Sequence, residues 1–591
     1  MITCLFCGKT VQDLNKHNRE EHLSASSLIQ RQPPKKAARP RAGQNAIETP
    51  AFTAPPENSF SQWVQSNPSM QMMQITADDI AEARNPRTDN PNTPTGALRN
   101  AMKYLIQDLI DGFSGLSDEL NRSACGALVR SAAIYPSLIA YTFTHIKCCL
   151  DDSSLLDTLA TNVAGWNTQG PLYCLLNYKS IRKTISDMLK QTNVEQHVCN
   201  ASLIGTHYGA RLDTVYIGAL MAEVAATPAM AKHMFALRGG EAQAIIDLLQ
   251  ALTDVESPEL DQWYKRRYLD ALIRLSRKAG LYPESLLLKN VTILGHEPLY
   301  SGSFGAVYKG ELHGRLAAIK RLKAGSGDLA SLLREFAHEA IVWRHIRHPN
   351  CLPFYGVYRV DGDNCMVSPW MENASLNIYL VNNPDADRLQ LIADIARGLH
   401  YLHTSQPTVV HGDLKGPNVL VTSAGRACLA DFGLSMTSIS QAVLPSSTEL
   451  KAMGSLNYVA PELLEGDSET LAKLDQRRCD MYSFGCVCYE ILVGKAPFQG
   501  MDRETIYRQK LVGNAPSRPK DQKYVDHGLD DDMWGFIVKF LHKIPESRAT
   551  AEQAGKWLGT KTIGPRPADW DTTFLSELTS PAVGYPFTST I

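Results

Sequence analysis

Three side chains suited to phosphoryl transfer lie close together in the segment VVHGDLKGPN, residues 409–418. Asp413 can orient an attacking hydroxyl and accept its proton, and Lys415 can sit near a transferred phosphate. Asn418 can offer its side-chain oxygen to Mg²⁺, a cation that favours hard oxygen ligands. Thirteen residues after Asn418, the segment ADFGLS supplies the carboxylate of Asp431 as a further oxygen ligand. The pattern predicts magnesium-assisted phosphoryl transfer.

A candidate phosphate-binding segment, SGSFGAVYKG, precedes this loop in the chain. Gly302 and Gly305 lack a Cβ, so their backbone amides can approach phosphate oxygens closely, although short glycine-containing hairpins are common without that role. Fifteen residues after Gly305, Lys320 could place its ammonium on the phosphates, and Glu339 on the next helix could hold it. Taken singly, these two residues are more often a solvated strand lysine and an exposed glutamate.

The elements around these residues change character along the chain. VTILG, AVYKGEL and RLAAIKRL, from about residue 291, have the composition of short β-strands separated by turn residues. After about residue 375, apolar residues recur at helical spacing and continue to about 558. The pattern predicts a small β-rich lobe followed by a larger helical lobe, which together would position the polar side chains.

In their order and spacing, SGSFGAV, AAIK, a helix glutamate, HGDLKGPN, DFG and APE resemble the motifs of the eukaryotic protein kinase family over residues 291–558. The resemblance implies a bilobal α+β fold, ATP and Mg²⁺ as cofactors, and protein substrates. The segment SPWMENASL is most similar to the tyrosine-kinase-like group, whose members are mostly serine/threonine enzymes, and Lys415 matches the serine/threonine pattern.

The resemblance also implies a role for each matched residue. Lys320 would pair with Glu339 and touch the α and β phosphates, Asp413 would be the catalytic base, and Asn418 and Asp431 would bind magnesium. Glu462 would pair with Arg548, Asp480 would hold the catalytic loop, and Ser368 would be the gatekeeper. The residues implied to bind the nucleotide are Gly302, Ser303, Gly305, Val307, Ala318, Lys320, Pro369, Met371 and Leu420.

The sequence departs from the family pattern at two positions. Tyr300 stands where the glycine-rich loop has its first glycine, which could alter loop mobility or ATP affinity. Gly412 stands where many members have an arginine that pairs with a phosphorylated activation loop, so we expect activity here to depend less on loop phosphorylation. The alternative to an active enzyme is a pseudokinase or scaffold that binds ATP and partners. Scaffolds of this kind usually lack at least one catalytic residue, whereas this sequence contains all of them: Lys320, Glu339, Asp413, Asn418 and Asp431.

The N-terminus, residues 1–23, contains a compact cluster of cysteine and histidine residues. Cys4 and Cys7 are followed by His17 and His22, and two thiolates with two imidazoles suit tetrahedral zinc. The segment resembles a C2H2 zinc finger, although nine residues separate Cys7 from His17 where about twelve are usual. A single short finger and a net charge of -2 disfavour nucleic acid as a partner, and protein binding is the rival.

The remaining segments complete the expected organisation of the chain. Residues 24–96 are polar and proline-bearing, which predicts a disordered linker, and residues 97–285 have helical periodicity, which predicts an α-helical domain that could bind a protein partner. Residues 559–591 have the composition of a flexible tail. No run reaches about 18 apolar residues, so we expect no membrane span. The cysteines are dispersed along the chain, which predicts reduced thiols and an intracellular, cytoplasmic protein. The basic run at residues 31–41 makes a nuclear location the alternative.

Overall fold

The computed structural model describes residues 2–3, 10–11, 119–150, 152–192, 200–255, 262–302, 305–322, 329–432, 436–437, 456–465, 474–562 and 569–579. The chain divides into two compact units, and each is described by itself. The first comprises Met1–Leu237, Leu248–Tyr268 and Ala582–Ile591, and the second comprises Arg238–Asp247 and Leu269–Pro581. The predicted linker, residues 24–96, and the first helical pattern, residues 97–116, lie outside the described residues.

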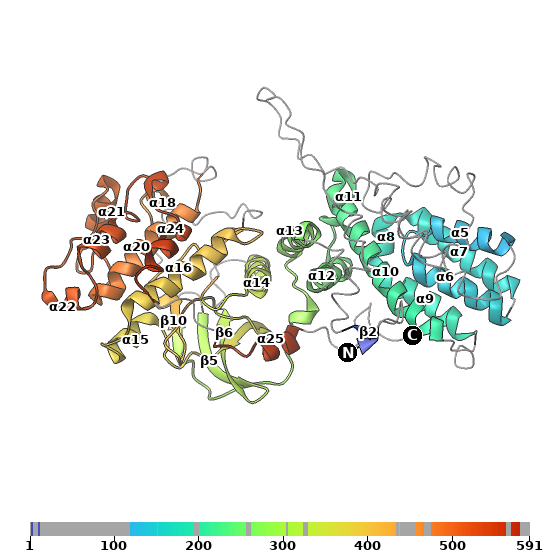
Figure 1. Ribbon diagram of the computed structural model, residues 1–591, viewed down its shortest axis with the longest axis horizontal. Helices are drawn as coiled ribbons and strands as arrows, with labels where there is room; N and C mark the ends of the chain where they lie inside the picture. The colour runs from blue at the N-terminus through green and yellow to red at the C-terminus, as the bar shows by residue number, and fades with distance from the viewer. Residues whose placement is uncertain are drawn as a thin grey trace, which may run out of the picture. The chain divides into compact units, whose positions relative to one another are not determined.

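The first unit is helical in its described part, apart from the strand pair β1 (Ile2–Thr3) and β2 (Thr10–Val11). Its helices, drawn in cyan to green in Figure 1, bury apolar side chains such as Ile139, Ile185 and Tyr216. They are α5 (Glu119–Ser131), α6 (Pro136–His145), the π-helix η3 (Ile146–Leu150), α7 (Ser153–Gln169), α8 (Pro171–Leu176), α9 (Tyr178–Lys190), α10 (Asn200–Ala226) and α11 (Pro228–Met234), with α12 (Gly239–Asp254) and α13 (Gln262–Ala279) divided between the units.

A buried carboxylate fixes the start of helix α6. Asp213, on α10, is 3% exposed and accepts hydrogen bonds from the backbone N–H groups of Ser137 (2.9 Å) and Leu138 (3.0 Å). These are donors that the first turn of a helix cannot satisfy internally. Burial raises the pKa of Asp213 to about 7, although the two backbone hydrogen bonds and the nearby Arg182 act in the opposite direction.

This carboxyl group predicts a pH-dependent stability. Its pKa rises from the ordinary 3.8 to about 7 on folding, so the stabilisation from its bound proton is complete below pH 4 and is lost as pH rises through 7. We expect hydrogen exchange in α6 to become faster between pH 5 and pH 8, beyond the intrinsic change in exchange rate. In Asp213→Asn this extra dependence should disappear, and an identical dependence in the variant would contradict the assignment.

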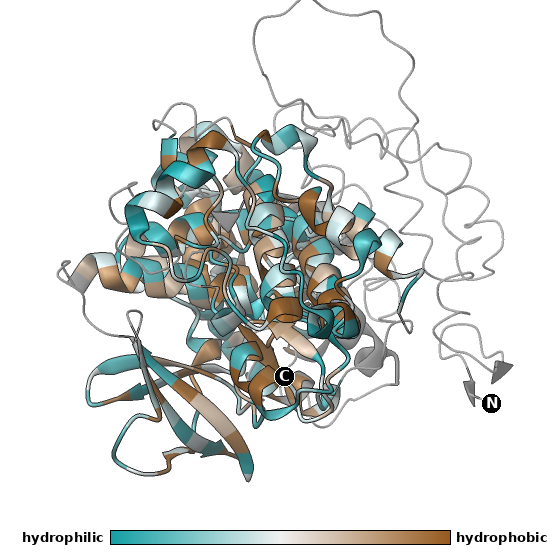
Figure 2. Cartoon of the chain, turned by 90° about the vertical axis from the view of Figure 1, so that its left-hand side faces the viewer, coloured by the Kyte–Doolittle hydropathy of each residue, from teal (hydrophilic) through white to brown (hydrophobic). Residues whose placement is uncertain are grey.

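The second unit contains a six-stranded antiparallel sheet. Its strand order is β3-β5-β6-β8-β7, with β4 paired to β5. The strands carry both polar and apolar stretches (Figure 2), and successive side chains point to opposite faces of the sheet. The strands are β3 (Val291–Ile293), β4 (Tyr300–Gly302), β5 (Gly305–Leu312), β6 (Arg315–Leu322), β7 (Gly356–Val360) and β8 (Asp363–Pro369), preceded by the 3-10 turn η5 (Glu284–Leu286).

The two faces of this sheet have different coverings. Helix α14 (Leu329–Arg344) follows β6 and carries Glu339, which Lys320 of the sheet contacts. Ile319 and Val367, neighbours across β6 and β8, belong to a separate apolar cluster that includes Phe574 of α25 (Thr572–Thr579). Figure 1 shows α25 beside β6.

The predicted flexible tail is therefore only partly correct. Phe574 is 7% exposed, and Asp571 forms an ion pair with Arg315 at 2.6 Å. Asp569 accepts hydrogen bonds from Thr422 and Arg426 in the helical lobe, so residues 569–579 contact both lobes. The sequence analysis relied on the polar, proline-bearing composition of the tail and gave no weight to Trp570, Phe574 and Leu578, which are spaced four residues apart.

The helical lobe follows β8, as predicted from about residue 375. Long helices α16 and α20 pack together, and most of their side chains are buried. The elements are α15 (Leu376–Asn382), α16 (Arg388–Thr404), β9 (Val409–Val410), η6 (Gly416–Asn418), β10 (Val419–Val421), β11 (Ala427–Leu429), β12 (Met436–Thr437), α18 (Glu462–Glu465), α20 (Arg477–Val493), α21 (Arg503–Val512), α22 (Gln522–Asp526), α23 (Asp531–Val538), η7 (Pro545–Ser547) and α24 (Ala551–Leu558).

Two further observations concern the described residues only. No single helix among them is long and apolar enough to cross a membrane; the pair Asp213–Ala226 and Pro228–Met234 reaches the required length and composition, but with a bend of 98°. The cysteines described as free thiols are all buried in the core, which accounts for them as apolar packing residues.

Candidate active site

Lys320 joins two carboxylates that are far apart in the sequence. Its Nζ lies 2.6 Å from Oδ1 of Asp431 and 3.4 Å from Oε1 of Glu339. Strand β6 supplies the lysine, helix α14 the glutamate, and the segment after β11 the aspartate. The predicted pairing of Lys320 with Glu339 is confirmed, and Asp431 shares the same ammonium.

Burial and charge act against each other in this cluster. Burial alone would lower the pKa of Lys320, but Glu339 and Asp431 outweigh it and raise that pKa. Burial would likewise raise the pKa of Asp431, yet the Lys320 ammonium holds it below its usual range. Burial raises the pKa of Glu339 more than Lys320 lowers it. The closer pair, Lys320 with Asp431, is therefore fully charged at neutral pH.

The predicted catalytic residues form a second cluster at the loop after β9. Lys415 donates a hydrogen bond to Oδ2 of Asp413 at 2.6 Å, and Asn418 Nδ2 donates to the same oxygen at 3.0 Å. Asn418 Nδ2 also donates to the backbone carbonyl of Asp413 at 2.8 Å. Because the amide nitrogen faces Asp413, Oδ1 is the atom of Asn418 left to face a cation.

A buried aspartate holds the backbone of this loop, as the sequence predicted. Asp480 is 2% exposed and accepts hydrogen bonds from the N–H groups of His411 (2.8 Å) and Gly412 (2.9 Å). His403 contacts its Oδ2 at 2.8 Å. Gly412 has φ +81°, a conformation that strongly favours glycine. The backbone conformation therefore gives a structural reason for glycine at position 412, besides the absence of the family's arginine.

Backbone contacts join the two clusters. The N–H of Ala430 donates to the carbonyl of Asn418 at 2.9 Å, which places Asp431 next to the magnesium-ligand candidate. His411 Nε2 lies 3.1 Å from the carbonyl of Ala430, so a tautomer protonated there donates to it. Asp431 has φ +64°, rare for a residue with a Cβ. Such strained conformations concentrate at functional sites.

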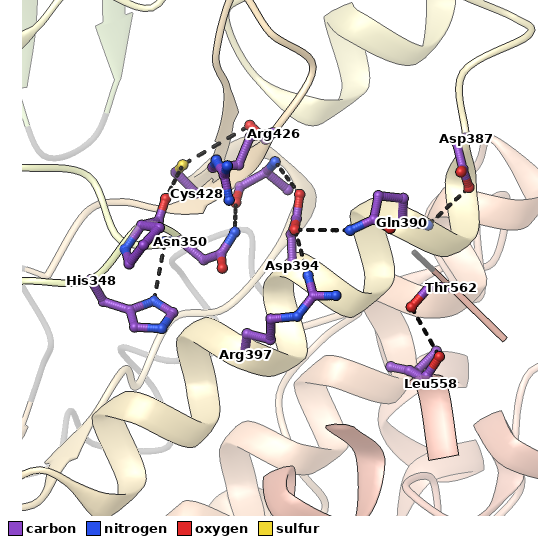
Figure 3. Close-up of polar contacts among 12 residues, drawn as sticks. His348, Asn350, Asp387, Gln390, Asp394, Arg397, Arg426, Cys428, Leu558 and Thr562 are labelled. Atoms are coloured by element: carbon purple, nitrogen blue, oxygen red, sulfur yellow. Dashed lines mark hydrogen bonds and ion pairs between the residues drawn. The ribbon is translucent and has the colours of Figure 1, made fainter. Parts of the chain in front are cut away.

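Helix α16 anchors strand β11, which leads to Asp431. Figure 3 shows Asp394, fully buried on α16, accepting hydrogen bonds from Arg397 (2.8 Å), Gln390 (3.3 Å) and the N–H of Ala427 (3.1 Å). Asn350 Nδ2 donates to the carbonyl of Ala427 at 3.0 Å. A hydrogen-bonded, buried network of this kind rigidifies its surroundings, and here it fixes the strand that presents the carboxylate.

The residues assigned to the nucleotide are aligned by strand register. Lys320 pairs with Val307, and Ala318 pairs with both Lys309 and the buried Ser368, so neighbouring positions on one sheet face include Val307, Ala318 and Lys320. Pro369 ends β8. Leu420 bridges Ser375, beside the segment that contains Met371. Gly302 and Gly305 pair across β4 and β5, whereas Ser303 lies outside the described residues.

Tyr300, the departure from the glycine pattern, packs at the edge of this sheet. Its ring stacks on that of Trp370 with centroids 6.4 Å apart, and Lys309 Nζ lies 5.2 Å from the Trp370 ring centroid. The tyrosine thus contacts the residue after β8. It replaces none of the charged side chains of the two clusters.

The sequence patterns did not single out two buried charged residues of the helical lobe, Glu490 and Lys510. Glu490 accepts hydrogen bonds from the N–H of Gly416 (3.2 Å), Asn377 (2.7 Å) and the Tyr458 hydroxyl (2.9 Å). Its place in the apolar run CVCYEILV was a usable signal, because a buried carboxylate needs partners. Lys510 is fully buried, but its helix is polar enough for the residue to look exposed in sequence.

The predicted zinc ligands Cys4, Cys7, His17 and His22 lie outside the described residues, so the finger stays a prediction. The strands β1 and β2 bracket the two cysteines in sequence and pair in antiparallel register, Ile2 with Val11 and Thr3 with Thr10. In the part of the chain that is described, no group of three or more His, Cys, Asp or Glu side chains is arranged to hold a metal.

Comparison with known proteins places this geometry in a family. Residues 295–557 match the family described as "Protein kinase domain". Similar proteins include "Probable serine/threonine-protein kinase drkA" of Dictyostelium discoideum, 30% identical over 261 residues, 43% of this chain and 37% of that protein. "Probable serine/threonine-protein kinase SIS8" of Arabidopsis thaliana is 32% identical over 290 residues, 48% of this chain and 26% of that protein.

A third relative, "Serine/threonine-protein kinase CTR1" of Arabidopsis thaliana, is 29% identical over 235 residues, 39% of this chain and 27% of that protein. The chain thus covers between 26% and 37% of the length of these three relatives. The match, the two-lobed architecture and the paired clusters agree: residues 295–557 are a protein kinase domain, similar in sequence to those of serine/threonine-protein kinases.

Proposed function

We propose that this chain is an active, Mg²⁺-dependent kinase that transfers the γ-phosphate of ATP to serine and threonine hydroxyls of proteins. The observation that carries the proposal is the contact of Lys320 with both Glu339 and Asp431, beside a loop in which Asp413, Lys415 and Asn418 are mutually bonded. Phosphoryl transfer needs positioning and charge stabilisation more than covalent chemistry, and these side chains supply both.

Each side chain has a distinct task in this proposal. Asp413 orients the acceptor hydroxyl and accepts its proton, and Lys415, 2.6 Å from it, offers positive charge toward the transferred phosphate. Lys320 binds the other phosphates. The oxygens of Asn418 and Asp431 fit magnesium, which when bound would neutralise phosphate charge. We also place the protein in the tyrosine-kinase-like group, on the motifs quoted above.

Radiolabelled ATP tests the proposal. The 591-residue chain, incubated with [γ-³²P]ATP, Mg²⁺ and dephosphorylated casein, should label the casein. Acid hydrolysis of that product should yield phosphoserine and phosphothreonine. Label confined to phosphotyrosine would contradict the serine/threonine assignment, and no transfer at all would favour the alternative of a scaffold that binds ATP and partners without catalysis.

The scaffold alternative has one feature in its favour. Tyr300 occupies the position of a loop glycine and is 47% exposed, stacked on Trp370. Aromatic stacking at the edge of the proposed nucleotide site could slow exchange of ATP, but the sequence contains every charged residue to which we assign a catalytic task. We therefore prefer catalysis, with ATP binding common to both functions.

Gly412 leads to a prediction about regulation. No arginine is present at that position to pair with a phosphorylated loop, so removal of the loop hydroxyls should leave at least about a third of wild-type kcat/KM. The measurement is casein phosphorylation by a variant with alanine at the seven loop positions named below. Wild-type protein treated with phosphatase is the control. A loss of several orders of magnitude would refute the prediction. The positions are Ser435, Thr437, Ser438, Ser440, Ser446, Ser447 and Thr448.

A further inference from the structure

Two aspartates separated by a single residue contact different lobes of the second unit. Asp569 accepts hydrogen bonds from Thr422 Oγ1 (2.6 Å) and from Nε and Nη2 of Arg426 (3.3 Å and 3.4 Å), in the turn between β10 and β11 of the helical lobe. Asp571 accepts one from Nη2 of Arg315, in the sheet, at 2.6 Å. With one residue between them, the Cα atoms of the two aspartates lie at most about 7 Å apart.

These contacts join the two strands that present the residues of the proposed nucleotide site. Arg315 is the first residue of β6, and Lys320 lies five residues further along the same strand. Arg426 immediately precedes β11, and Asp431 lies five residues beyond that arginine. Lys320 and Asp431 meet at 2.6 Å. The two strands are therefore connected twice, directly at the site and through the aspartates at their other ends.

Helix α25 reinforces the connection to the sheet, and Figure 1 shows it beside β6. Phe574 packs in the apolar cluster on one sheet face, with its ring edge-on to that of Tyr355 and the centroids 5.3 Å apart. The guanidinium carbon of Arg315 lies 4.4 Å from the centre of the Phe574 ring. The N–H of Phe574 donates to Oδ1 of Asp571 at 3.0 Å, so one carboxylate both pairs with Arg315 and caps the helix.

The connection to the helical lobe is buried. The side chain of Arg426 is 2% exposed and that of Asp569 is 18% exposed. Thr422 is also buried, and its carbonyl accepts a hydrogen bond from Asn373, in the segment between β8 and α15, at 2.7 Å. Removal of a partner from a buried arginine is costly because the arginine keeps its charge. We therefore expect Asp569 to hold its lobe firmly.

We propose that residues 569–579 act as a strap that holds the two lobes at the separation at which Lys320 and Asp431 share one nucleotide, and that thereby slows nucleotide release. The strap lies beyond residues 295–557, so the family match does not account for it. The proposal rests on the nucleotide-binding part of the proposed function.

Asp569 and Asp571 are positioning residues in this proposal, since they act through the strands and not by contact with the nucleotide. Movement of the lobes away from each other would have to break the buried contact of Asp569 with Arg426 or withdraw Phe574 from the sheet. Each of these breaks has a cost, so the strap favours the closed arrangement and raises the fraction of the protein that is competent to retain nucleotide.

The first test lengthens the strap without removing a contact. Insertion of Gly-Ser-Gly-Ser-Gly-Ser after Trp570 keeps both aspartates but loosens the connection between them. The dissociation rate of the fluorescent analogue mant-ATP with Mg²⁺, measured by stopped flow on the 591-residue chain, should rise about fivefold because a longer connection costs more entropy to close. The same insertion after Gly564, ahead of the strap, is the control and should match the wild type.

The second test removes one contact. Asp569→Ala should raise the mant-ATP dissociation rate about tenfold, the lower end of the effect expected on loss of hydrogen bonds to a charged group. Asp569→Glu keeps the carboxylate and should recover most of the loss. In steady-state assays the KM for ATP should rise in Asp569→Ala and in the insertion after Trp570, whereas the KM for casein should stay within about twofold.

A folded Trp570 insertion variant that releases mant-ATP at the wild-type rate would overturn the strap, as would equal effects of the two insertions. If that variant does not fold, equal release rates in wild type and Asp569→Ala would overturn it instead. A wild type that binds mant-ATP but transfers no phosphate would refute catalysis alone and leave the strap measurable. A wild type that binds no nucleotide would refute both proposals.

Discussion

Asp413→Asn should lower kcat for protein phosphorylation by about 10²–10⁴-fold, the usual contribution of a positioned general base. Asparagine has nearly the same shape, but its amide cannot accept the hydroxyl proton. It would also replace one carboxylate that Lys415 and Asn418 now share at 2.6 Å and 3.0 Å. The KM for ATP should stay within about threefold, because the loss concerns an interaction made in the transition state.

The control for this variant is Asp385→Asn, an exposed aspartate between α15 and α16 with the same change of charge. It should retain wild-type kcat. Circular dichroism and nucleotide binding would establish that Asp413→Asn is folded. Full activity in a folded Asp413→Asn protein would exclude Asp413 as the base, whatever else binds in the site.

Arg548→Met should lower the free energy of unfolding of the helical lobe by about 3–5 kcal/mol, because it leaves a partly buried carboxylate without its partner. Arg548 is fully buried at its side chain and forms two hydrogen bonds with Glu462, at 2.6 Å and 2.7 Å. Its remaining donors contact the carbonyls of His542, Arg478 and Lys543. One substitution therefore leaves several buried acceptors unsatisfied.

The change in the free energy of unfolding is measured by the urea dependence of hydrogen exchange in α20, which reports on the helical lobe itself. A local measurement is needed because the chain has two units and need not unfold in one step. The matched control is Arg508→Met, which breaks an ion pair with Glu504 whose side chains are 75% and 67% exposed. Exposed pairs contribute only about 0–1 kcal/mol, so this variant should differ little from wild type. Equal effects of the two substitutions would show that the Glu462–Arg548 pair has no special structural role.

Part of the geometry followed from the resemblance to the protein kinase family, which implied specific contacts between residues of this sequence. The Lys320–Glu339 pair, the hold of Asp480 on the catalytic loop and the Glu462–Arg548 pair were each predicted and are each present. The strand and helix patterns also predicted the two lobes in the correct order. Short polar motifs between apolar elements can be recognised in a sequence, because turns and metal-binding sites tolerate few residue types.

Contacts between distant segments were not predictable in the same way. Lys510 contacts partners in other segments of the chain, and its polar helix gives no sign of its burial. The apolar run around Glu490 indicates burial but not the partners of its carboxylate. Phe574 lies in a short segment between proline-bearing stretches, and its burial depends on an apolar face of the sheet formed elsewhere. Gly412 was read as a missing arginine, whereas its positive φ is visible only in the backbone. Tertiary packing, rather than local pattern, determines all of these.

The central claim is that Lys320, Asn418 and Asp431 converge on one magnesium-bound nucleotide. A crystal structure of the protein with Mg²⁺ and a non-hydrolysable ATP analogue tests it most directly. The account predicts the metal on Asn418 Oδ1 and Asp431, with Lys320 on the α and β phosphates and still paired with Glu339. A nucleotide bound elsewhere, or a metal held by other residues while Asp431 keeps Lys320, would contradict it.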